Sequence, residues 1–253
     1  SVLGVSSVWF IGTVLTGNLP VYAEAHLGGA QTLYVFALAV FSIGVGVGSL
    51  LCEKLSARTV EIGLVPLGSI GLTIFGLDLA FASLALPAAT GELPLGALLG
   101  QPGVWRVLAD LLLLGLFGGF FIVPLYALVQ LRSTPDKRAR IIAANNIINA
   151  FFMVVGALAA AAMFAGGLSI PMLFAVAAIC NAAIAVFIYG LVPEFLLRFL
   201  AWVLIHLFYR VKKRGVEHIP HEGAALIICN HVSFVDPVIL MAVSTRPIRF
   251  VMD

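Results

Sequence analysis

Residues 104–131 read VWRVLADLLLLGLFGGFFIVPLYALVQL, the longest apolar stretch of the chain. A bilayer core about 30 Å thick is crossed by roughly 20 apolar residues in a helix, so this stretch predicts a spanning helix that tilts or begins outside the hydrocarbon. Hydrophobic residues make up 62% of the 253 residues and charged residues only 10%. Because soluble domains are roughly 45–50% apolar, this composition predicts a polytopic membrane protein.

Polar breaks divide the apolar part of the chain into six predicted membrane spans, which run over residues 2–22, 32–51, 61–86, 104–131, 141–165 and 169–192. Six spans with both ends on one side of the membrane suit one half of a twelve-helix transporter. The net charge of +2 is too small to indicate a nucleic-acid partner. The three cysteines share no redox or metal-ligand spacing, and we identify no metal site.

Basic residues fall on alternate connections between the predicted spans. One set of connections carries Lys54 and Arg58, then the run from Arg132 to Arg140, then Arg198 and residues 210–214. The other set supplies only Arg106. The positive-inside bias therefore predicts that the basic connections and both ends of the chain face the cytosol.

Polar residues inside the spans are the candidates for a substrate pathway, because an unsatisfied polar group in hydrocarbon is costly. Asp78 and Asp110 lie toward the predicted external ends of their spans, where solvation at the interface explains them equally well. Asn145 and Asn149 share a helix face at i, i+4 spacing, and hydrogen bonding between helices would also account for them. The glycines at 44, 46, 48, 115, 118 and 119 predict close helix packing.

The segment after the sixth span is apolar but short. Residues 195–209 read FLLRFLAWVLIHLFY and precede the basic residues Arg210, Lys212, Lys213 and Arg214. We predict a helix that lies in the membrane interface, with Trp202 and Tyr209 at headgroup depth and the basic residues on anionic lipid. A shallow re-entrant or seventh membrane segment is the alternative.

The motif ICNHVSFVDPV at residues 228–238 follows a segment, residues 224–229, that reads as a buried strand. Pro237 suits the first turn of a helix whose N-cap would be Asp236. A histidine with a pKa near 6.5 can remove the proton of a hydroxyl, and a neighbouring carboxylate can hold the imidazole in the right tautomer. The less specific interpretation is a loop histidine, His231, beside a helix cap.

The N-H-x-S-F-x-D pattern of this motif resembles the glycerolipid acyltransferases. The resemblance implies that His231 is the general base and Asp236 its orienting partner, and that residues 246–253 (RPIRFVMD) begin the next strand, where Arg249 could meet a lipid phosphate. It also implies an acyl thioester, on acyl carrier protein or coenzyme A, as the donor. No bound cofactor is expected.

Residues 138–156 (RARIIAANNIINAFFMVVG) resemble a cytosolic loop and helix of bacterial lysophospholipid transporters of the major facilitator superfamily. Residues 48–58 (GSLLCEKLSAR) occupy the place of the superfamily's loop motif, but Cys52 and Glu53 stand where an aspartate is expected and Ala57 replaces a glycine. Together with the acyltransferase motif, the chain resembles proteins in which such a transporter is fused to a 2-acylglycerophosphoethanolamine acyltransferase and often to an acyl-carrier-protein synthetase.

These resemblances imply an all-α membrane bundle, the second half of a major facilitator fold, followed by the start of an α/β acyltransferase domain. The expected division is residues 1–192 for the bundle, 193–214 for the linker helix and 215–253 for the acyltransferase segment. We expect a fragment of a longer protein of the bacterial inner membrane, inactive as an acyltransferase by itself, with membrane phospholipids and lysophospholipids as partners. Asn145, Asn149, Asp78 and Arg249 are the predicted substrate-binding residues.

Three functions remain open from the sequence. In the first, a lysophospholipid is translocated to the cytosolic leaflet and reacylated there. In the second, the helices only anchor an acyltransferase. In the third, the bundle transports another solute and the appended domain is inactive.

Overall fold

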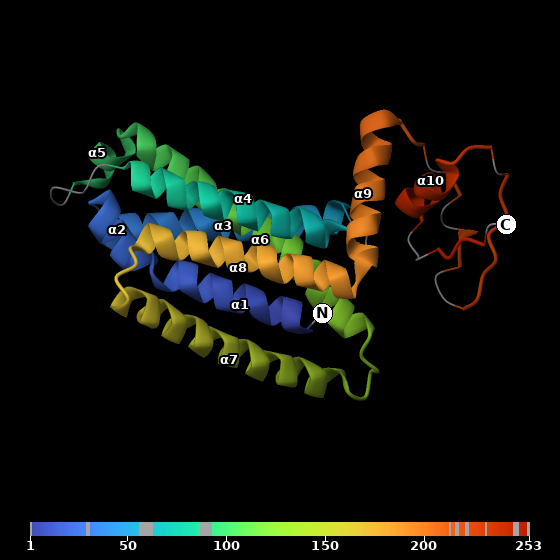
Figure 1. Ribbon diagram of the computed structural model, residues 1–253, viewed down its shortest axis with the longest axis horizontal. Helices are drawn as coiled ribbons and strands as arrows, with labels where there is room; N and C mark the ends of the chain where they lie inside the picture. Colours follow the sequence, from blue (N-terminus) through green and yellow to red (C-terminus); the bar gives the residue numbers. More distant parts are fainter. Residues whose placement is uncertain are drawn as a thin grey trace.

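The computed structural model of the protein describes residues 2–28, 31–55, 63–86, 93–212, 214–215, 218–220, 223–230, 232–244 and 248–251. This part of the chain forms ten helices (Figure 1), which are α1 (Val2–Gly17), α2 (Leu19–Leu27), α3 (Gln31–Leu55), α4 (Leu64–Ala85), α5 (Leu95–Leu99), α6 (Pro102–Leu131), α7 (Arg138–Ala165), α8 (Ile170–Leu191), α9 (Pro193–Phe208) and α10 (Asp236–Val243).

Among the described residues, six helical segments are long and apolar enough to cross a membrane, which confirms the six predicted spans. The boundaries differ most in the first span, which is two helices, α1 and α2, rather than one helix ending at residue 22. The break at Asn18 has a local cause, because Pro20 has no N–H for a helical hydrogen bond. At the break, the side-chain Nδ2 of Asn18 donates to the carbonyl of Val14 at 2.6 Å.

Helix α6 lies at the centre of the bundle and packs closely on α3. A Cβ atom added to Gly44 or Gly48 would overlap the backbone of α6, and one added to Gly115 or Gly119 would overlap the backbone of α3. The predicted close packing is confirmed for these four glycines. Gly46 has no atom within 4 Å of such a Cβ, and Gly118 has only Leu72 Cδ2 at 3.9 Å, so the interpretation of these two glycines as close-packing residues is wrong.

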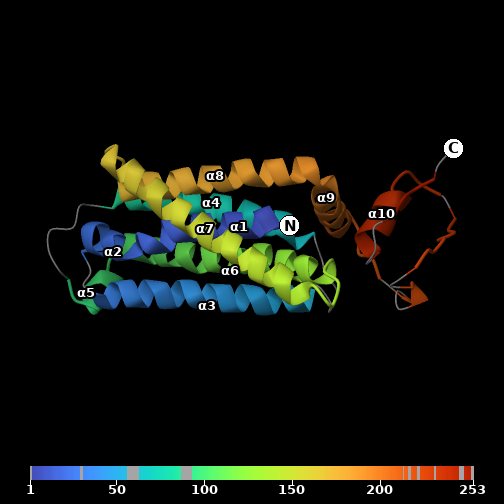
Figure 2. The ribbon, with the colours of Figure 1, turned by 90° about the horizontal axis from the view of Figure 1, so that it is seen from below.

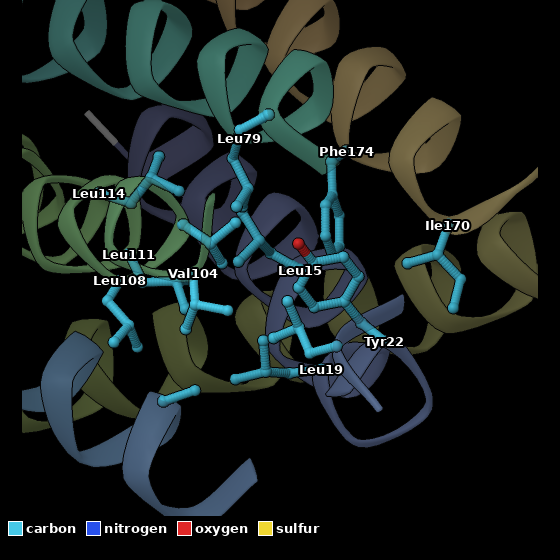
Figure 3. Packing of buried hydrophobic residues seen from close by; sticks show 14 of the residues in the cluster. Leu15, Leu19, Tyr22, Leu79, Val104, Leu108, Leu111, Leu114, Ile170 and Phe174 are labelled. Carbon is cyan, nitrogen blue, oxygen red and sulfur yellow. The ribbon is translucent and has the colours of Figure 1, made fainter. Parts of the chain in front are cut away.

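Buried side chains from α1, α2, α3, α4, α5, α6 and α8 form one cluster (Figure 3). This cluster lies toward the end of the bundle that carries α2 and α5, away from α9 (Figure 1). Tyr22 is fully buried there and stacks edge to face on Phe174, with ring centroids 5.2 Å apart. Its hydroxyl shares a 2.6 Å hydrogen bond with Ser83, which satisfies the polar atom that this burial would otherwise strand. Tyr22 therefore joins α2 to α4 through Ser83 and to α8 through Phe174.

The opposite end of the bundle carries the basic connections. The last turn of α3, the α6–α7 connection and the α8–α9 junction lie together near the N-terminus, whereas α2 and α5 lie at the other end (Figures 1 and 2). The structure thus groups the basic connections as predicted. Helix α7 is peripheral and packs chiefly on α1.

Helix α9 runs across this basic end at a steep angle to the six spans, and α10 packs on its outer side (Figure 1). The predicted helix is therefore present, while its place in the membrane interface stays a prediction. The prediction of a buried strand at residues 224–229 is wrong, because this segment is exposed and without regular structure. A strand forms by pairing, and the described residues offer it no partner strand.

Candidate functional site

The turn before α10 is organised by the carboxylate of Asp236. Its Oδ2 atom accepts hydrogen bonds from the backbone N–H groups of Val232 at 2.7 Å and Ser233 at 2.8 Å. The N–H of Asp236 in turn donates to the carbonyl of Ser233 at 3.0 Å. The carboxylate is therefore held in a turn that begins directly after residue 231.

The helix begins one residue earlier than predicted. Val235 is the N-cap of α10, Asp236 is the first helical residue and Pro237 lies in the first turn, where its missing N–H costs nothing. Asp236 is thus not the N-cap, because its side chain bonds to the preceding turn instead. His231 lies outside the described residues, so its pairing with Asp236 stays a prediction.

Helix α10 is fixed to α9 by a buried arginine. The Nη2 atom of Arg198 donates to the carbonyl of Ser244, the C-cap of α10, at 2.8 Å, and Arg198 is only 8% exposed. A hydrogen bond to a buried charged group contributes about 1.5–3 kcal/mol. The junction between the bundle and the predicted acyltransferase segment is therefore a specific contact.

A groove lies between α9 and the start of α10, beside Asp236. Its volume is about 500 Å³, and its lining is apolar, from Leu204, Ile205, Phe208, Tyr209, Val235 and Val238. Val235 and Val238 flank the carboxylate-bearing residue in sequence. Such a surface can hold a hydrocarbon chain next to a polar reacting group.

A second set of functional candidates lies inside the bundle, between α1, α6 and α7. Asn149 is 5% exposed, and its amide lies 2.8 Å from the hydroxyl of Ser6 and 2.9 Å from that of Tyr126. When its amide oxygen faces Tyr126, it also accepts from Asn145 Nδ2 at 3.1 Å and Trp9 Nε1 at 3.2 Å. We call Ser6, Trp9, Tyr126, Asn145 and Asn149 the polar cluster.

The polar cluster confirms that Asn145 and Asn149 share a helix face. It lies in the half of the bundle nearer α9, since Asn145 is seven residues into α7, or about 10 Å at 1.5 Å per residue. The substrate-binding role of the two asparagines stays a prediction. Their hydrogen bonds account for Asn149 fully, but Asn145 Oδ1 is buried and has no partner among the described residues.

Asp78 belongs to neither of these sites. It forms an ion pair with Arg106 at the end of the bundle away from α9, and both side chains are more than a third exposed. Asp110, one turn beyond Arg106 on α6, is buried, and its Oδ2 has no partner among the described residues. Arg249 is exposed in the segment 248–251, and its contact with a lipid phosphate stays a prediction.

The sequence did not predict the hydrogen bonds that Ser6, Trp9, Tyr126 and Arg198 form. A buried partner for Arg198 could have been predicted, because a single charge inside an apolar segment is costly unless it has a partner. Arg106, the one arginine or lysine among the residues described at that end of the bundle, was likewise the natural partner for Asp78. Nothing in the sequence singles out Ser6, Trp9 or Tyr126, since they meet Asn149 only through the packing of three helices.

Comparison with known proteins adds one finding. A family model described as Acyltransferase matches residues 210–253. These residues include the turn of Asp236, helix α10 and two residues that line the α9–α10 groove, Val235 and Val238. No curated protein and no solved structure matches the chain. The match suggests acyl transfer as the chemistry of this segment, and the six apolar helices indicate a membrane protein.

Proposed function

We propose that the protein translocates a lysophospholipid through the helix bundle and reacylates it at the membrane surface with an acyl thioester. The observation that carries this proposal is the junction of α9 and α10. A segment that matches the acyltransferase family packs on a helix lying across the end of six membrane-spanning segments. An enzyme placed there would meet lipid hydroxyls at the depth where they leave the bundle.

For the acyl step, we assign His231 as the general base and Asp236 as its orienting partner. The base takes the proton of the lipid hydroxyl while the oxygen attacks the thioester carbonyl, and the thiol leaves with a proton. Asp236 is suited to its role because the backbone N–H groups of Val232 and Ser233, the two residues that follow position 231, fix its carboxylate. The α9–α10 groove would hold an acyl chain alongside.

For the transport step, we assign the lipid pathway to the side of the bundle that carries the polar cluster. Its five residues are uncharged, and Trp9 is 38% exposed, so the cluster is open at one edge. We place the basic end in the cytosol of a bacterial inner membrane, following the positive-inside bias. Acyl carrier protein and coenzyme A are both candidate carriers of the acyl group.

The test uses the full-length protein in vesicles and measures two rates, translocation of labelled lysophosphatidylethanolamine and its conversion to the diacyl lipid. His231→Ala should retain translocation and lose conversion. Wild-type protein that acylates without translocating would reduce the bundle to an anchor, and translocation of an unrelated solute with no conversion would contradict the proposal altogether.

A further inference from the structure

Asn145 Oδ1 is a buried hydrogen-bond acceptor that lacks a donor. Asn145 is 1% exposed, and this oxygen has no partner among the described residues in either orientation of the Asn149 amide. Leaving a buried polar group unpaired costs about 1–3 kcal/mol, so such a group in a native structure marks a place where another molecule supplies the missing partner.

The surroundings of this oxygen restrict what that molecule can be. Ser6, Tyr126 and Trp9 are joined to Asn149 by hydrogen bonds, and none of the cluster residues carries a charge. A neutral site with one vacant acceptor fits a hydroxyl better than an anionic phosphate, which would require positive charge or several donors.

An apolar space begins next to the polar cluster. Tyr126, Val8 and Leu72 pack on one buried cluster of side chains, and Val8 and Leu72 also line a cavity of about 60 Å³. Gly12, one turn after Trp9, lines the same cavity, and a Cβ added to it would meet no atom within 4 Å. A molecule with a hydroxyl at Asn145 could therefore direct hydrocarbon toward Gly12.

We propose that Asn145 recognises the free glycerol hydroxyl of a lysophospholipid and thereby makes the bundle prefer lysophospholipids to diacyl phospholipids. This inference rests on the proposed function, because it assigns the transported lipid to the polar cluster. A diacyl lipid carries an ester in place of that hydroxyl and would leave Asn145 Oδ1 unpaired. Sites built to bond a hydroxyl reject analogues without it because the buried partner is then stranded.

The test measures equilibrium binding of two labelled lipids to the full-length protein in nanodiscs. The first lipid is lysophosphatidylcholine, whose quaternary ammonium has no N–H, so that its glycerol hydroxyl is its donor. The second is the analogue with hydrogen in place of that hydroxyl. Wild-type protein should bind the first at least about tenfold more tightly, which is the loss expected for one stranded acceptor.

Asn145→Ala should abolish this preference by weakening lysophosphatidylcholine binding and leaving the analogue unchanged. Asn146→Ala is the matched control, since Asn146 is the neighbouring asparagine on α7 and is exposed, and it should keep the preference. The comparison of two lipids on wild-type protein needs no variant, so it stands even if Asn145→Ala misfolds.

Equal binding of the two lipids by wild-type protein would overturn the assignment, and Asn145 would then be satisfied by water. Failure of the wild-type protein to bind any lysophospholipid would contradict the proposed function as well.

Discussion

The side chain of Asp236 is held in place before any partner residue is considered, because the backbone of the preceding turn fixes its carboxylate. An aspartate at the N-cap of a helix commonly bonds to backbone N–H groups in the first turn of that helix. Asp236 bonds instead to Val232 and Ser233, so its carboxylate faces the residues that follow position 231. The turn itself therefore depends on the residue to which we assign the orienting role.

Substitution of His231 and Asp236 tests their assignment to the acyl transfer step. We expect His231→Ala and Asp236→Ala each to lower acyl transfer by the full-length protein at least about 100-fold, the scale of general base catalysis. The measurement is the initial rate of diacyl lipid formation. His218→Ala, at an exposed histidine of the same segment, is the control and should retain activity; equal losses in all three variants would contradict the assignment.

The polar cluster marks the limit of prediction at the residue scale. Helical periodicity placed Asn145 and Asn149 on one face, and their side chains indeed meet. Their partners Ser6 and Tyr126 are separated from Asn149 by 143 and 23 residues, so no local pattern joins them. Asp78 illustrates the same limit, because its partner Arg106 comes from another span.

At the scale of helices, length and hydropathy were sufficient to predict the six spans, because a bilayer fixes how many apolar residues a helix needs. The break between α1 and α2 was not predicted, although Pro20, which cannot donate a helical hydrogen bond, indicates one. The supposed strand at 224–229 was wrong because apolar composition favours a strand only where a neighbouring strand completes its hydrogen bonds.

Glycine substitutions should test the packing of α3 on α6. In Gly48→Ala the new methyl group would overlap the backbone of Leu116, which cannot move without separating the two helices. Overpacking of this kind costs about 1–3 kcal/mol, so the apparent melting temperature in detergent should fall. Gly46→Ala, two residues away with open space around it, should leave the melting temperature unchanged or raise it. Equal effects would contradict the close contact.

The hydrogen bond between Arg198 and Ser244, which joins α9 to α10, can be tested by substitution. Arg198→Gln shortens the side chain that reaches the carbonyl of Ser244, so α10 should become more accessible to hydrogen exchange and acyl transfer should fall, while translocation is unchanged. Arg210→Gln is the control because Arg210 is exposed just beyond α9. A loss of translocation in Arg198→Gln would indicate that α9 supports the bundle and not the junction.

At the scale of the whole molecule, the polar cluster and the acyltransferase segment lie toward the same end. The polar cluster is in the half of the bundle nearer α9, and the basic connections, the α9–α10 groove and the turn of Asp236 are at that end. Figure 1 shows α9 and α10 at this end of the bundle. A lipid leaving the bundle on this side would meet the acyltransferase segment without diffusing through the bilayer. The sequence alone predicted that the basic connections and the acyltransferase segment share one side of the membrane, and the structure adds the packing of α10 on α9.

The most direct test of this account restricts the substrate to one leaflet. Full-length protein is reconstituted with its acyltransferase segment on one face of the vesicle, labelled lysophospholipid is confined to the opposite leaflet, and formation of the diacyl lipid is followed after the acyl donor is added. The account predicts product at a rate well above spontaneous lipid crossing in protein-free vesicles, and no product with His231→Ala. Product formed only when the lysophospholipid shares the leaflet of the acyltransferase segment would contradict it.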